Sequence, residues 1–159
     1  MAKSAYDIAP DATYIEAAHS SLRQQLEEMM ANLEGTRAGD DIEALHDMRV
    51  ASRRLRAALS VFGAAFPPKP FAVTEKEVAR VTDALGAVRD ADVQIEFIQS
   101  AEESAPESEK VGLRAFQEYL QKGRDKERVL LIKELNRLEK SDFLRDFDRL
   151  LGEETKDNG

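Results

Sequence analysis

The chain has 159 residues, of which 34% are charged and 42% hydrophobic, and its net charge is −8. This length suits one domain over residues 1–159, with a core at about 11–151 and frayed ends at 1–10 and 152–159. The absence of cysteine excludes disulfides and thiolate chemistry, and no apolar run approaches the ~20 residues that span a bilayer. Because the N-terminus also lacks a signal-peptide pattern, we expect a cytoplasmic protein without a membrane partner.

Apolar residues recur every three or four positions in four long segments, the pattern that predicts amphipathic helices. Asp11 is a suitable N-cap for the first helix, which we expect to reach about Glu34. Its predicted inward positions are Ile15, Ala18, Leu22, Leu26, Met29 and Leu33. His19 lies on the apolar side of this helix, and we interpret it as a structural side chain.

A second helix should follow Asp40 or Asp41, either of which can cap it, and continue to about Phe66. The three prolines within residues 67–70 should end it, because proline lacks an amide donor and disfavours helix in the preceding residue. The apolar stripe of this helix comprises Met48, Leu55, Leu59, Phe62 and Phe66.

Three more helices complete the predicted fold. Thr74 followed by Glu77 resembles a capping box, so the third helix should start there and fade near Ser100. The fourth helix is expected over residues 107–139, and a short fifth over residues 142–151. The inward positions should be Val78, Val81, Leu85, Val88 and Ile95, then Leu113, Phe116, Leu120, Leu131, Leu135 and Leu138. Long amphipathic helices joined by short breaks predict an all-α, up-down four-helix bundle with a short C-terminal fifth helix.

Basic residues are concentrated in residues 46–56, which hold four arginines and one aspartate on an otherwise acidic chain. On a helix, intervals of three, four and three residues give a stripe about 15 Å long that comprises His46, Arg49, Arg53 and Arg56. It is rotated by about 125° from the apolar stripe at 100° per residue, and it contains no acid. Arginine forks match phosphate oxygens, and histidine gains charge as the pH falls, so the stripe favours a row of phosphates.

Three arginines on later helices are further candidates for the same ligand: Arg89, Arg124 and Arg128. Asp90 and Asp92 are expected to pair with arginines of the second helix. Gly86 costs about 1 kcal/mol within a helix relative to alanine, so we expect it to allow close helix packing. For every basic residue the alternative is a solvated face, or pairing with one of the 31 acids of the chain.

Two segments resemble the CHAD family, the conserved histidine α-helical domain. They are residues 46–56, His-Asp-Met-Arg-Val-Ala-Ser-Arg-Arg-Leu-Arg, and residues 85–93, Leu-Gly-Ala-Val-Arg-Asp-Ala-Asp-Val. The resemblance covers about residues 11–151 and implies a helical domain that binds inorganic polyphosphate through basic residues and has no established catalytic activity. It implies ligand contacts at His46, Arg49, Arg53 and Arg56, with Arg54 and Arg89 secondary.

Typical family members contain two pseudo-symmetric four-helix halves, and this chain resembles only the first. Either two chains pair as a two-fold homodimer, which would bring two basic stripes together, or a reduced member binds with less affinity. We expect no cofactor, no catalytic residue and no metal site, and His46 and Asp47 are poor candidates for a metal because adjacent helix positions do not share a face.

Two other functions stay open at this stage. A histidine phosphotransfer domain is also a four-helix bundle, in which His46 would accept the phosphoryl group beside Arg49. A structural or interaction bundle would instead satisfy its arginines with internal acids. Nucleic acid is disfavoured as a partner, because the chain is acidic, has no tryptophan and offers no aromatic stacking platform.

Overall fold

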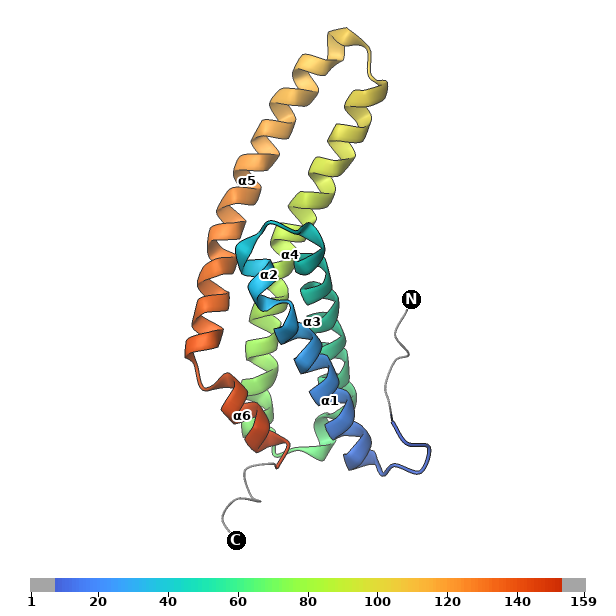
Figure 1. Ribbon diagram of the computed structural model, residues 1–159, viewed down its shortest axis with the longest axis vertical. Coiled ribbons are helices and arrows are strands. Elements are labelled where there is room, and N and C mark those ends of the chain that lie inside the picture. Colours follow the sequence, from blue (N-terminus) through green and yellow to red (C-terminus); the bar gives the residue numbers. More distant parts are fainter. Residues whose placement is uncertain (1–7, 153–159) are drawn as a thin grey trace.

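The computed structural model describes residues 8–152 (Figure 1). Its elements in chain order are α1 (Tyr14–Ala31), α2 (Leu33–Ala38), α3 (Ile42–Phe62), the short 3-10 helix η1 (Gly63–Ala65), α4 (Pro68–Ser104), α5 (Glu107–Lys140) and α6 (Phe143–Leu150). These residues form helices and no strand, which confirms the predicted all-α bundle. The expected frayed ends, 1–10 and 152–159, lie mostly outside the described residues.

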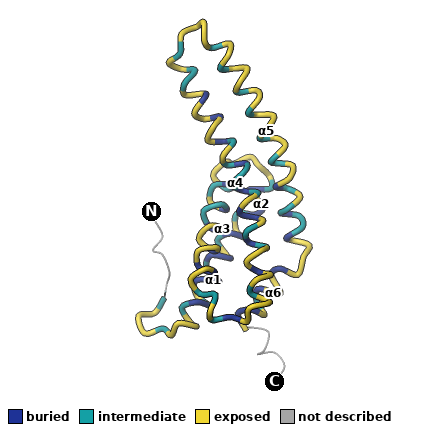
Figure 2. Tube along the Cα trace, turned by 180° about the vertical axis from the view of Figure 1, so that it is seen from behind, coloured by how far each residue is buried: buried dark blue, intermediate teal, exposed yellow. Residues whose placement is uncertain are grey.

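Helices α3 and α4 form the centre of the bundle. Helix α1 packs on α3, and both α5 and α6 pack on α4. One cluster of buried apolar side chains runs through these helices, and its largest fully buried members include Leu22, Met29, Leu55, Leu85 and Phe147. Figure 2 shows that the buried residues gather in the part of the molecule that holds α1, α3 and α6, and that the outer ends of α4 and α5 are mostly exposed. The apolar positions predicted for the third helix are all buried.

Helices α4 and α5 continue beyond the other helices as an antiparallel pair (Figure 1). With 37 residues, α4 is about 55 Å long at 1.5 Å per residue. We call residues 93–122, the outer part of this pair, the arm. The prediction that Phe116 faces inward is wrong, since 47% of its surface is exposed. Only α4 faces α5 in the arm, so one narrow seam is buried there, and Leu113 and Leu120 are partly buried.

The first predicted helix is two helices. Its N-cap is Thr13 and not Asp11, because Thr13 forms a capping box in which its hydroxyl accepts from the Glu16 amide, and the Glu16 carboxylate accepts from the Thr13 amide. Hydrogen bonds from the Thr13 amide and hydroxyl to the Glu16 carboxylate lower the pKa of Glu16. Ile15 is exposed, contrary to prediction. The chain breaks at Asn32 before α2, and His19 stacks on the ring of Phe66 at 5.9 Å, which fits its structural role.

The proline segment starts a helix as well as ending one. Helix α3 ends at Phe62, four residues before the predicted end, and α4 begins at Pro68. Proline is tolerated in a first helical turn, because the amide it lacks would have no partner there. The predicted start at Thr74 is therefore wrong: its hydroxyl donates to the Pro70 carbonyl inside the helix. Helix α4 also continues past the predicted end to Ser104, whereas α5 lies within one residue of prediction.

Replacing Gly35 with alanine should destabilise the fold. A Cβ built on Gly35 would lie 2.8 Å from the Ala44 Cβ, so α2 and α3 would have to separate. We expect Gly35→Ala to lower the free energy of unfolding by about 1–3 kcal/mol, measured by chemical denaturation. Gly123→Ala is the control, because no atom lies within 4 Å of its Cβ position, and it should raise stability by up to about 1 kcal/mol. Equal effects of the two substitutions would contradict the close approach of α2 to α3.

Candidate functional site

An open groove runs between α3 and α4. Its walls consist of Arg49, Arg53 and Arg56 from α3, and Thr82, Asp83, Gly86, Ala87 and Asp90 from α4. The groove therefore brings together three of the four side chains of the predicted basic stripe. Each wall follows the helical repeat of its own sequence, because residues three or four apart share one face of a helix.

The position of the arginines follows from the burial of α3. Met48, Leu55 and Leu59 are fully buried, so the face that carries the arginines turns toward the edge of α4. A Cβ on Gly86 would lie 3.7 Å from the Arg49 Nε atom, an ordinary contact, so an alanine would fit there and the expected role of Gly86 in close helix packing is not confirmed. Arg49 is three-quarters buried, and its Nε atom has no hydrogen-bond partner among the described residues.

Two aspartates of α4 face two of the three arginines. Asp90 Oδ1 lies 3.8 Å from Arg49 Nη2, as the predicted pairing of Asp90 required, and Asp83 Oδ1 lies 3.5 Å from Arg56 Nη1. Both carboxylates are more than 70% exposed. Arg53 is exposed and forms no ion pair with any residue in the described part of the chain. The groove thus contains one unpaired guanidinium between two loosely paired ones.

Arg137, on α5, shows what tight internal pairing looks like in this fold. Arg137 donates to Glu77 at 2.6 Å and to Glu134 at 3.0 Å, and the Glu77 hydrogen bond raises the pKa of Arg137. Burial alone would raise the pKa of Glu134, but hydrogen bonds from Arg137 and Arg80 lower it below its ordinary value. The ion pairs in the groove are longer by about 1 Å, so its arginines are more accessible to a ligand.

His46 lies one helical turn before Arg49 and does not line the groove. Its side chain is partly buried, and its Nδ1 atom is buried without a hydrogen-bond partner among residues 8–152. The structure therefore separates His46 from the three arginines with which the sequence grouped it. A side-chain rotation or a ligand at the end of the groove would be needed to join them.

The secondary candidates Arg54 and Arg89 also lie outside the groove lining. Arg54 points to α1, where its Nη1 atom lies 4.0 Å from Glu28. Arg89 lies 3.5 Å from Glu96 of its own helix. Arg54 and Arg89 lie on helix faces beside the groove, so only a ligand that extends over the edge of the groove would contact them.

Arg124 and Arg128 serve the packing of α5. Arg124 Nε donates to Asp92 at 2.5 Å, so Asp92 pairs with α5 and not, as expected, with α3. Arg128 donates to the carbonyls of Thr36 and Arg37 in the last turn of α2. Its guanidinium occupies the space that a side chain on residue 39 would need, and Gly39 has a φ of 76°. Neither arginine lines the groove.

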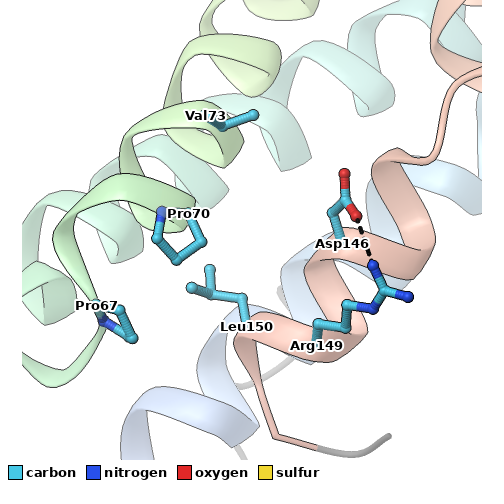
Figure 3. Close-up of a pocket in the computed structure, with 6 residues that line it drawn as sticks. All are labelled: Pro67, Pro70, Val73, Asp146, Arg149 and Leu150. Atoms are coloured by element: carbon cyan, nitrogen blue, oxygen red, sulfur yellow. Dashed lines mark ion pairs between the residues drawn. The ribbon is translucent and has the colours of Figure 1, made fainter.

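A second hollow lies at the base, between the start of α4 and α6 (Figure 3). Pro67, Pro70, Val73 and Leu150 form most of its wall, and its charges are those of an Asp146–Arg149 pair 3.7 Å apart. A mostly apolar wall with one ion pair does not suit a polyanion. Within the described residues, no three His, Cys, Asp or Glu side chains converge as around a metal ion, and no helix has the length and hydropathy to span a bilayer.

The sequence interpretation missed Asp83 and Thr82 as groove residues. The signal was present, because Asp83, Gly86, Ala87 and Asp90 recur at intervals of three, one and three on a helix. This pattern alone could not identify Asp83 and Thr82 as groove residues, because in the sequence they look like ordinary helix positions. Their role becomes visible only when α3 is placed beside α4. Their importance depends on which arginines they face.

If Arg124 acts in packing, removing it should affect stability and not anion binding. Arg124→Met leaves the Asp92 carboxylate, which is 4% exposed, without its partner. We expect a loss of roughly 2–4 kcal/mol in the free energy of unfolding by chemical denaturation. Asp92→Leu combined with Arg124→Met should recover most of that loss, because no buried charge then remains. A large loss of anion affinity in a stable Arg124 variant would contradict this assignment.

The comparison with known protein families agrees with the resemblance seen in the sequence. The sequence pattern of the CHAD domain matches residues 20–158, which include the whole groove and all helices except the first turns of α1. Among curated proteins, none matches the chain. The chain belongs to the CHAD domain family.

Proposed function

We propose that this protein binds inorganic polyphosphate, or a closely related phosphate-rich polyanion, in the groove between α3 and α4, without catalysing a reaction on it. The observation that carries the proposal is the unpaired Arg53 at the centre of three arginines on one groove wall. An exposed guanidinium without an acidic partner binds phosphate oxygens bidentately without first losing an ion pair. Membership in the CHAD domain family supports the same ligand class.

The proposed ligand lies along α3. Arg49 and Arg56 are seven residues apart, or about 10 Å at 1.5 Å per residue, and Arg53 lies between them. A linear chain of phosphates can contact all three, whereas a single phosphate cannot. The Nε atom of Arg49 is buried without a hydrogen-bond partner among the described residues, so the rest of its guanidinium is what such a chain would contact. A protonated His46 would extend the contacts at one end.

Two rival functions are weaker on these contacts. A phosphotransfer domain needs room for one phosphoryl group beside His46, whereas the groove is lined by three arginines and not by His46. In a purely structural bundle, the arginines would form ion pairs as short as that between Arg137 and Glu77. Arg53 forms no ion pair among the described residues. The cytoplasmic location expected from the sequence stays a prediction.

We also propose that two copies of this chain pair through the arm. Exposed apolar surface on a projecting element is typical of an interaction site. On α5, one face carries the stacked rings of Phe116 and Tyr119, 6.2 Å apart, between Gly112 and Gly123, at intervals of four, three and four residues. This spacing is the one by which two helices pack along a seam.

The charges beside this face favour a second copy as the occupant. At 100° per residue, Lys122 lies on one side of it and Glu127 on the other. In a parallel two-fold pair of α5 helices, Lys122 of each copy would lie against Glu127 of the other, and such flanking pairs select partners in parallel coiled coils. Each dimer would then present two grooves.

Arg53→Ala should weaken polyphosphate binding without affecting the fold. We expect a loss of at least about 10-fold in affinity for short-chain polyphosphate, measured by titration calorimetry, because a charge-assisted hydrogen-bond donor is removed. The affinity of the unchanged protein should fall by about 10- to 40-fold between roughly 50 and 200 mM salt, as expected for three phosphate contacts. Arg49→Ala combined with Arg53→Ala should abolish most of this salt dependence.

The matched control is Arg145→Ala, which changes net charge equally on α6, where Arg145 pairs with Asp142. Its affinity should equal that of the unchanged protein. Equal losses in Arg53→Ala and Arg145→Ala would indicate non-specific attraction and reject the groove. A phosphoryl adduct on His46 after exposure to acetyl phosphate, detected by mass measurement, would instead favour phosphotransfer.

Pairing through the arm predicts a concentration-dependent molar mass. Light scattering at micromolar concentrations should give twice the 17.8 kDa of one chain, and Phe116→Ser with Tyr119→Ser should restore the monomer. The control Val111→Ser removes an apolar side chain that is at least as exposed, from another face of α5, and should leave the dimer intact. A monomer at every concentration would exclude the proposed pairing.

A further inference from the structure

The groove has an acidic wall opposite its arginine wall. Asp83 and Asp90 are the acidic residues among those that line it, and both come from α4. Against Arg49, Arg53 and Arg56, they leave the groove with a net charge of +1, although α3 alone offers +3. The two carboxylates therefore remove most of the positive charge that the sequence of α3 by itself predicts.

The spacing of the two walls matches. Asp83 and Asp90 are seven residues apart, as are Arg49 and Arg56, and each aspartate lies within 4 Å of one of these arginines. Arg53 lies between the two pairs and has no acidic partner within the described chain. An anion can bind Arg53 without displacing any side chain. To bind Arg49 or Arg56, it must take the place of the aspartate carboxylate that is already paired with that arginine.

We propose that Asp83 and Asp90 are tethered counter-ions that an incoming polyanion must displace from Arg56 and Arg49, and that they thereby limit the affinity of the groove. This inference rests on the proposed function of the groove as a polyanion site. A short anion binds Arg53 and displaces nothing. A long anion gains contacts to all three arginines, and it displaces both carboxylates and then lies beside two negative charges.

The geometry of the pairs fits displacement. At 3.5 and 3.8 Å they are longer than a charge-assisted hydrogen bond, and the carboxylates are 76% and 72% exposed. Exposed ion pairs of this kind contribute little to stability, so a ligand can replace them without unfolding the helices. The same exposure lets each aspartate turn toward water once its arginine is taken.

Asparagine substitutions test this role, because they keep the shape of the side chain and remove its charge. We expect Asp83→Asn and Asp90→Asn each to tighten long-chain polyphosphate binding by up to about 5-fold, and the double variant by roughly 3- to 30-fold. Pyrophosphate, which is too short to reach all three arginines, should gain less than the long chain. The affinity of the double variant should also fall more steeply with salt, because more guanidinium charge becomes available to the ligand.

The control is Glu118→Gln, which removes one exposed negative charge from the arm and should leave the affinity unchanged. Unchanged or weaker binding in the double variant, while the unchanged protein still requires Arg53, would overturn the inference and leave the proposed function intact. Weakening seen only with added Mg²⁺ would show that the carboxylates hold a bridging cation, which also overturns it. If the unchanged protein does not bind polyphosphate at all, both proposals fail.

Discussion

The packing of α3 against α4 is the constraint on which the rest of the structure depends. Helix α3 buries Met48, Leu55 and Leu59, and that burial fixes the direction of every other face of the helix. The arginine stripe is rotated by about 125° from the buried one, so it must emerge along the edge of α4. The groove is therefore a consequence of core formation, and its basic wall cannot turn away without exposing the core.

The protein uses the same side chain for two opposite purposes. Arg124, Arg128 and Arg137 each satisfy a carboxylate or a helix-terminal carbonyl and hold α5 against its neighbours. Arg53 satisfies nothing within the described chain. Since a buried carboxylate without a partner is costly, arginines near Asp92 or Glu77 are committed to structure. The arginines that stay available to a ligand are those whose acidic partner is exposed to solvent, and those that have no acidic partner among the described residues.

Element boundaries show how far local patterns reach. The start of α5 was predictable to the residue, because a helix that follows Pro106 has a sharp local signal. The start of α4 was not, since prolines within residues 67–70 were read only as helix breakers, although proline is also accepted in a first turn. Phe116 failed for another reason: its periodicity is helical, but no third helix reaches the arm to cover it.

The amino-acid sequence by itself determined the helical class, the apolar stripes and the stripe that holds His46, Arg49, Arg53 and Arg56, because each depends only on the 3.6-residue repeat of one helix. Only the tertiary structure decided which of these basic residues work together. Pairing between helices depends on which faces meet, and no periodicity within one segment encodes this. The fold placed Asp83 and Asp90 opposite two arginines, left Arg53 without an ion pair among residues 8–152, and kept His46 out of the groove lining.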